Sequence, residues 1–314
     1  MNKRLITLTA LLIVYFLWGG TYLGIRLAVA TIPPYLMAGT RFLLAGSLVY
    51  LYARLTGAKP PLRAHWIDGG ISGGLLLLGG NGLICWSEQL VPSGIAALLV
   101  ATVPLWMILL GLLGKDRRRP GIVVLGGVLL GFSGIGLLVL PAGGASGRVD
   151  PAGIAALVVG SFLWSLGSLS SRRARVPASP LLAVSLQMIV GGALMLLASG
   201  LLGEWPRLVL ARVTLKSVLG MGYLVLFGSI IAYSAYIWLL KNADPTWVST
   251  YAFVNPVVAV FVGWLIAGER LSTHSLWAAV VILLSVVVIT VQKNREAAAV
   301  RRRIVPFQSG KSPA

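Results

Sequence analysis

The sequence predicts an all-α integral membrane protein with ten transmembrane helices arranged as two inverted five-helix repeats. The first observation is composition: of 314 residues, 57% are hydrophobic and 11% are charged, and the mean hydropathy is +0.90. Soluble domains average about 25% charged residues, so the composition indicates a membrane protein. The second observation is a series of apolar segments of membrane-spanning length, and the third is a likeness between the two halves of the chain.

Each apolar segment has about 20 residues, the length that a helix needs to cross a bilayer core of about 30 Å. The N-terminal segment continues past any plausible cleavage point without a small-x-small site, so we expect a retained first span instead of a signal peptide. The predicted spans are residues 6–28, 33–53, 67–86, 93–113, 121–140, 151–171, 180–202, 218–240, 246–267 and 275–292.

The internal repeat pairs residues at two constant offsets along the chain. Because each half has five spans, an odd number, the second half begins on the opposite side of the membrane and the repeat is inverted. We expect a first repeat over residues 1–141, a second over 142–292 and a basic cytoplasmic tail over 293–314. Inverted repeats are typical of transporters that alternate access around a central site. The pairs are Trp18 with Trp164, Arg26 with Arg172, Pro34 with Pro180, Arg41 with Gln187, Gly46 with Gly192, Trp86 with Trp238, Pro104 with Pro256, and Gly111 with Gly263.

The net charge of +18 is explained mainly by topology. If the N-terminus is cytoplasmic, the great majority of the 26 lysines and arginines fall in cytoplasmic segments. The positive-inside rule then places both termini in the cytoplasm of a bacterial inner (plasma) membrane protein. We therefore expect no nucleic-acid partner, and we expect the tail to be attracted to anionic lipid.

Several classes of site are disfavoured. The one cysteine, Cys85, cannot form an intramolecular disulfide, and His65 and His274 fall in opposite loops, so we expect no metal site. No phosphate-binding loop and no nucleophile–base pattern appears, so we expect no cofactor and no enzymatic activity; a lipid-modifying enzyme is a weak alternative. The expected partners are the lipid bilayer and a small-molecule substrate, with the chain a monomer or a homodimer.

Several motifs resemble the drug/metabolite transporter superfamily, in its ten-span EamA-type branch that includes the YedA-like transporters. They are WGGTY at 18–22, PPYLMAGTRF and NGLICWSEQLVPSGIAALLVATVPLW in the first half, and GYLVLFGSIIAYSAY, YAFVNPVVAV and GERLS in the second. The resemblance covers about residues 5–292 and implies export of small organic metabolites or drugs, with amino acids, nucleobases, sugars and toxic cations all within the family's range. Glu269 matches the family's glycine–glutamate pair, whereas in the first half Gly114 is followed by Lys115.

Arg41 is the leading candidate for substrate binding. It follows Pro33 by roughly two helical turns, which places it about 12 Å below the membrane boundary. A charge near the bilayer centre costs about 2.5–3.5 kcal/mol, so Arg41 should face a wet cavity or a partner. Its guanidinium would suit a substrate carboxylate; the alternative is a structural arginine that is bonded to main-chain carbonyls at a kink.

Other polar and aromatic residues at depth are candidates for the cavity wall, although core packing or an interfacial belt would also explain the aromatic ones. Pro104 and Pro256 each free a carbonyl, at Val100 and Ala252, and are candidate gating positions or plain kinks. The remaining substrate-binding candidates are Gln187, Asn81, Asn255, Trp18, Tyr22, Tyr236 and Tyr251.

The driving force is weakly marked in the sequence, because all eight acidic residues lie at span ends or in loops. Glu88 is either a proton carrier or the ion-pair partner of Arg26, and we favour the ion pair. A passive facilitator of the same substrates is the alternative to a coupled exporter.

Overall fold

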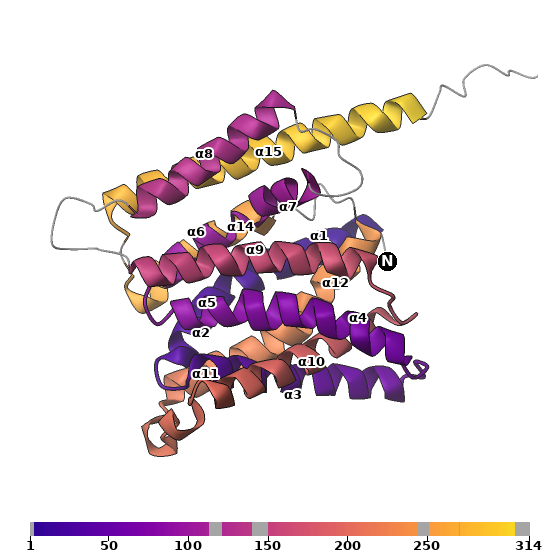
Figure 1. Cartoon of the computed structure of the whole chain (residues 1–314), viewed down its shortest axis with the longest axis vertical. Helices are drawn as coiled ribbons and strands as arrows, with labels where there is room; N and C mark the ends of the chain where they lie inside the picture. Colours follow the sequence, from indigo (N-terminus) through magenta and orange to yellow (C-terminus); the bar gives the residue numbers. More distant parts are fainter. Residues whose placement is uncertain (1–2, 113–120, 140–149, 244–250, 270, 305–314) are drawn as a thin grey trace, which may run out of the picture.

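The computed structural model describes residues 3–112, 121–139, 150–243, 251–269 and 271–304, and the described residues are helical or in turns and connections. Within these ranges, eight helices are long and apolar enough to cross a membrane, and two shorter apolar helices, Ile122–Leu137 and Val254–Ala267, bring the number of apolar helices to ten. The helices lie side by side in Figure 1, with the N-terminus at the right.

The five spans of the first half are built from eight α-helices and two π-helical segments. The first span consists of α1 (Lys3–Ile13), the π-helix η1 (Val14–Trp18) and α2 (Gly19–Val29). The second is α3 (Pro34–Leu55), and the third is α4 (Arg63–Gly73), the π-helix η2 (Gly74–Asn81) and α5 (Gly82–Ser87). The fourth is α6 (Ser93–Val100) with α7 (Val103–Leu112), and the fifth is α8 (Ile122–Val139).

The second half follows the same order. Its first two spans are α9 (Pro151–Arg173) and α10 (Pro180–Leu201), followed by two short 3₁₀ turns, η3 (Trp205–Arg207) and η4 (Leu210–Arg212). The eighth span is α11 (Leu215–Tyr223), the π-helix η5 (Leu224–Ala232) and α12 (Tyr233–Asn242). The last two spans are α14 (Tyr251–Ala267) and α15 (Thr273–Ile304).

The helices α3 and α10 show the internal symmetry most directly. Both have 22 residues, and the matched prolines Pro34 and Pro180 stand at their N-termini, where the missing N–H of proline costs nothing. After each helix comes a glycine in the left-handed region, Gly57 (φ 90°) and Gly203 (φ 66°), at the same sequence offset as the prolines. The repeat read from the sequence is therefore also a repeat of helix start, length and termination.

Small residues let α3 and α10 approach closely. A Cβ added at Gly192 would lie 2.6 Å from the Leu43 nitrogen and 2.9 Å from the Gly39 oxygen, both main-chain atoms of α3. A Cβ added at Gly46 would lie 2.7 Å from Cβ of Met188 on α10. Close approach of this kind maximises van der Waals contact, which drives helix association where lipid is as apolar as the side chains.

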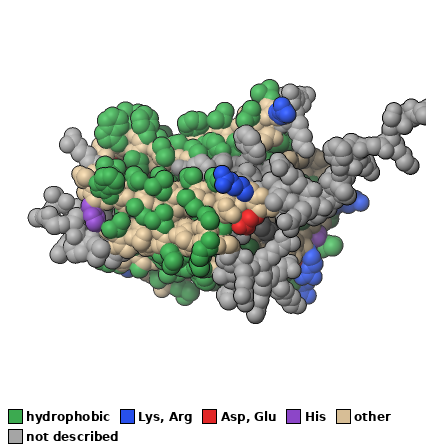
Figure 2. Space-filling model, turned by 90° about the horizontal axis from the view of Figure 1, so that it is seen from above, with side chains coloured by type: hydrophobic (Ala, Val, Ile, Leu, Met, Phe, Trp, Pro, Cys, Tyr) green, Lys and Arg blue, Asp and Glu red, His purple; other side chains and the backbone are tan. Residues whose placement is uncertain are grey.

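The surroundings of the bundle agree with a bilayer. The face in Figure 2 is mainly hydrophobic, and the Lys and Arg side chains visible on it lie in the half nearer the N-terminus. At the edge of the bundle, α8 and α15 pair with each other (Figure 1).

An exposed ion pair, with Nε of Arg175 2.8 Å from Oδ2 of Asp68, joins the two halves. Its hydrogen bonds and charge raise the pKa of Arg175.

Two predicted spans differ from the structure. The fourth is interrupted at Ala101–Thr102, beside Pro104, because proline lacks the N–H that would continue the helix. The tenth does not end at residue 292: α15 continues to Ile304, so the first part of the basic tail is helical. The beginning of the predicted ninth span, before Tyr251, lies outside the described residues.

Candidate functional site

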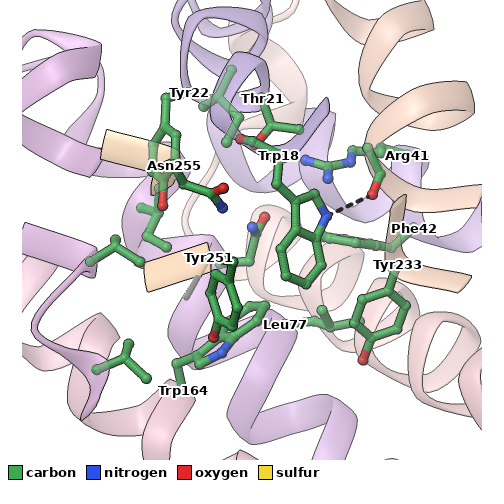
Figure 3. A pocket seen from close by; sticks show the side chains of 16 residues that line it. Trp18, Thr21, Tyr22, Arg41, Phe42, Leu77, Trp164, Tyr233, Tyr251 and Asn255 are labelled. Atoms are coloured by element: carbon green, nitrogen blue, oxygen red, sulfur yellow. Dashed lines mark hydrogen bonds between the residues drawn. The ribbon is translucent and has the colours of Figure 1, made fainter. Parts of the chain in front are cut away.

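A narrow cavity with a volume of about 70 Å³ lies inside the bundle (Figure 3). At roughly 10–15 Å³ for each water, it has room for about five of them. Residues from both halves line it, drawn from the first, second, third, fourth, sixth, eighth and ninth spans. They are Trp18, Thr21, Tyr22, Ile25, Arg41, Phe42, Leu77, Asn81, Ile84, Val100, Val103, Trp164, Gly228, Tyr233, Tyr251 and Asn255.

Arg41 provides the positive charge of this cavity. It is 4% exposed, its Nε donates to Oγ of Ser229 at 2.8 Å, and its Cζ lies 4.4 Å from the centroid of the Phe42 ring. Its Nη1 is buried and has no hydrogen-bond partner within the described part of the chain. The guanidinium is thus fixed at one nitrogen and unsatisfied at another, and unsatisfied buried donors are costly. The structural alternative was an arginine bonded to main-chain carbonyls. It does not fit Nε, which donates to a side-chain hydroxyl, or Nη1, which donates to no described residue.

A second unsatisfied polar atom belongs to the same cavity. Asn255 is 4% exposed, and its Oδ1 has no partner among the described residues. In Figure 3 the side chains of Asn255, Trp18 and Arg41 lie around the same cavity. The cavity therefore offers a hydrogen-bond donor that is charged and an acceptor that is neutral.

Three π-helical segments bring their residues to this cavity. Trp18 ends η1, Leu77 and Asn81 belong to η2, and Gly228 belongs to η5. A π-helix closes its hydrogen bonds over one residue more than an α-helix does, and such segments are frequent at functional sites. The Gly228 carbonyl accepts a hydrogen bond of 3.1 Å from Nε1 of Trp18, which connects the two halves across the cavity (Figure 3).

Aromatic rings of the second half gather around Trp18, which belongs to the first half. The ring centroids of Tyr236, Tyr251 and Tyr233 lie 4.8, 5.6 and 6.2 Å from that of Trp18. Such separations are typical of favourable aromatic pairs, each worth about 0.5–1.5 kcal/mol beyond area burial. The cluster fixes the indole that forms one wall of the cavity.

The interruption at Pro104 also faces the cavity, since Val100 and Val103 line it. Hydroxyl groups of α9 compensate for the broken helix: Ser161 donates to the Leu99 carbonyl at 3.3 Å, and Ser165 donates to the Val103 carbonyl at 3.0 Å. This is how a broken helix is tolerated at membrane depth. By contrast, α14 runs through Pro256 without an interruption.

Of the residues predicted for substrate binding, most line the cavity: Arg41, Asn81, Asn255, Trp18, Tyr22 and Tyr251. Gln187 and Tyr236 do not line it. Gln187 lies behind it, where its Oε1 accepts a hydrogen bond of 2.6 Å from the Tyr233 hydroxyl. Tyr236 packs against Trp18.

Sequence reasoning missed several lining residues, including Phe42 and Trp164. The repeat itself contained the signal for Trp164, since this residue is the partner of Trp18 and both line the cavity. Nothing in the sequence marked Ser229 as the residue that holds Arg41.

The predicted ion pair between Glu88 and Arg26 is wrong. Nη1 of Arg26 donates to two main-chain carbonyls, those of Glu88 at 2.5 Å and Val91 at 2.9 Å. The Glu88 carboxylate oxygens have no hydrogen-bond partner among the described residues. The carbonyl of Glu88 lies at the end of α5 and that of Val91 in the following connection, where carbonyls lack intrahelical partners. They accept hydrogen bonds from the guanidinium that we had expected to pair with the Glu88 carboxylate.

Two other acidic residues have structural roles at the same end of the bundle. The carboxylate of Glu204 accepts from the main-chain N–H groups of Tyr35 at 3.3 Å and Leu36 at 2.8 Å, at the start of α3. The carboxylate of Glu269 accepts from the Ser93 nitrogen at 3.2 Å and hydroxyl at 2.8 Å, at the start of α6. Both Glu204 and Glu269, which belong to the second half, thus cap a helix of the first, where the helix dipole favours negative charge.

Comparison with known proteins gives a consistent result. The profile of the EamA-like transporter family matches residues 5–140 and 151–291. The inner membrane transporter YedA of Escherichia coli is 40% identical over 287 residues, which cover 90% of each chain. The transporter YvbV of Bacillus subtilis is 24% identical, over 94% of this chain and 95% of its own. A solved crystal structure has the same fold, with a TM-score of 0.62 at 22% identity over 93% of this chain and 98% of the other. The chain belongs to the EamA-like transporter family.

Proposed function

We propose that the protein is an inner-membrane exporter of small organic metabolites that carry a carboxylate group, with amino acids as the foremost class. It would work by alternating access between repeats 1–141 and 142–292, with both termini cytoplasmic. The observation that carries this proposal is that Arg41 lines the cavity and that its buried Nη1 has no hydrogen-bond partner among the described residues. A carboxylate would satisfy it with a charge-assisted hydrogen bond.

The size and lining of the cavity support small, polar substrates. About 70 Å³ is too little for a drug-sized ligand, whose pockets usually have several hundred Å³. Asn255 Oδ1 would accept a hydrogen bond from a substrate ammonium while Arg41 binds the carboxylate. The aromatic ring of Trp18 would cover the apolar part of the substrate.

The interruption at Pro104 supports the alternating-access part of the proposal. Two hydroxyl bonds from α9, in the second half, hold the broken fourth span of the first half. Exchange of these bonds would let α7 move relative to α6. Pro104 and Pro256 therefore remain our candidate gating positions.

The test is substrate exchange in vesicles of purified protein, first with a panel of radiolabelled amino acids and related metabolites. Arg41→Lys and Arg41→Ala are compared with Arg54→Ala, a control that removes an exposed arginine from the same helix. Loss of a hydrogen bond to a charged group costs about 1.5–3 kcal/mol, or roughly a 10- to 150-fold lower apparent affinity. We expect that loss in Arg41→Ala, a partial loss in Arg41→Lys, and none in the control.

A carboxamide analogue of the best substrate identifies the group that Arg41 binds. If Arg41 binds the carboxylate, the analogue binds the wild type weakly, and the difference between substrate and analogue disappears in Arg41→Ala. Equal discrimination in both proteins, or no transport of any compound by folded wild type, would refute the proposal.

A further inference from the structure

Glu88 combines complete burial with the absence of any hydrogen bond to its carboxylate. The residue directly follows α5, its main-chain N–H donates to the Ile84 carbonyl at 3.1 Å, and its exposed fraction is 0%. Neither carboxylate oxygen has a partner in the described ranges. The neighbouring acids Glu204 and Glu269 differ, because each accepts hydrogen bonds at a helix start. A structural capping role therefore does not account for Glu88.

A line of polar side chains connects Glu88 with the cavity. Asn81, Cys85 and Glu88 follow one another at helical spacing (i, i+4, i+7), which places them on one side of the third span. Sγ of Cys85 donates to Oδ1 of Asn81 at 3.4 Å, and Asn81 lines the cavity. The carboxyl group thus lies at the end of a polar stripe that begins at the proposed substrate site.

The charged and titratable groups that act on Glu88 come from several elements. They are Arg26 and Tyr22 on the first span, Arg41 on α3, Cys85 on α5 and Glu269 after α14. Burial, followed by the charge of Glu269, raises the pKa of Glu88 well above its ordinary value, and Arg26 and Arg41 oppose this only in part. An ionised carboxylate that is buried without hydrogen bonds is costly, so in this conformation the neutral acid is the stable form.

From this geometry we infer that Glu88 is the proton-binding site that couples transport to the proton gradient. The inference rests on the proposed export function. A proton enters from the side on which the third span ends and forms one O–H bond on the carboxylate. It leaves to water in the cavity, toward which the Cys85–Asn81 stripe leads, and from there reaches the other side. When the proton has left, the ammonium group of a substrate in the cavity supplies the compensating positive charge. Proton and substrate therefore travel in opposite directions, without any redox step.

The experiment uses full-length protein in sealed vesicles, with the membrane potential clamped at zero and a gradient of about one pH unit imposed. If one proton exchanges for one substrate, this gradient drives about a tenfold concentration ratio of substrate. We expect the full ratio in wild type and in Glu204→Gln, a matched control that alters a buried but hydrogen-bonded acid. Glu88→Gln should give no accumulation yet retain substrate-for-substrate exchange, because glutamine resembles the protonated acid but cannot release a proton.

Accumulation by Glu88→Gln equal to that of the wild type would overturn the inference. Equilibration by wild type without any response to the gradient would also overturn it, and would identify a passive facilitator.

A second measurement does not depend on finding a substrate. The infrared carbonyl band of a protonated carboxyl group is titrated in wild type, Glu204→Gln and Glu88→Gln. A band that is present near neutral pH in wild type and Glu204→Gln but absent from Glu88→Gln supports the proton site even if the proposed substrates fail. If wild type shows no such band, Glu88 is ionised and the inference is wrong.

Discussion

Replacement of Gly192 by alanine should separate α3 from α10 and displace Arg41. The added Cβ would lie 2.6 Å from the Leu43 nitrogen, whereas ordinary contacts begin near 3.4 Å, so the helices must part by about 0.8 Å. The opposing atoms belong to the main chain of α3 and cannot rotate away. Overpacking of this kind costs about 1–3 kcal/mol, against a gain of about 0.5–1 kcal/mol from replacing a helical glycine.

The expected net loss is therefore about 1 kcal/mol and at most about 2.5 kcal/mol, or a decrease in Tm of roughly 1.5–4 °C for a chain of this length. The shift also acts on the site, because Arg41 lies two residues before Leu43 on the same helix. A displacement of α3 by about 0.8 Å along the bond between Arg41 Nε and Ser229 Oγ, which lies on η5 and not on α10, would lengthen that bond from 2.8 Å to beyond hydrogen-bond distance. A misplacement of about 1 Å can reduce activity by about 100-fold, so substrate exchange should fall at least tenfold.

The assay compares thermal unfolding in detergent and substrate exchange in vesicles for Gly192→Ala and Gly222→Ala. Gly222 is the control because a Cβ added there meets nothing within 4 Å. We expect the control to match wild type in exchange and to equal or exceed it in Tm. If Gly192→Ala matches the control in both measurements, the close crossing of α3 and α10 does not position Arg41.

Three further predictions concern single contacts. Ser229→Ala removes the bond that holds Nε of Arg41, so apparent substrate affinity should fall by roughly 10-fold and Tm should fall by a few degrees, because Nε is left buried and unsatisfied; unchanged affinity would contradict this role. Glu204→Ala removes the cap of α3 and should lower Tm by about 1.5–3 °C, from a loss of about 1–2 kcal/mol, whereas a Tm equal to that of wild type would exclude capping. Arg175→Ala breaks an exposed ion pair with Asp68 and should leave Tm unchanged within error; a clear decrease would show that this pair stabilises the bundle.

The sequence by itself determined the fold class, because each of its signals is local or periodic. Apolar segments of membrane-spanning length, the odd number of spans in each half and the pairing of Pro34 with Pro180 required no knowledge of contacts. Sequence reasoning also identified Arg41 correctly as a buried residue near the centre of the bundle, since a charge at that depth has few other places to lie.

Tertiary structure alone decided which residues meet. Gln187, the repeat partner of Arg41, lies behind the cavity, and Ser229, distant in sequence, holds the Arg41 side chain. The π-helical segments could not be predicted, because they depend on packing between spans and not on local propensity. Arg26 and Glu88 form no ion pair, because free carbonyls at the end of α5 compete for the guanidinium. Hydrogen-bond competition of this kind depends on where main-chain groups lie in space, which spacing along the chain does not specify.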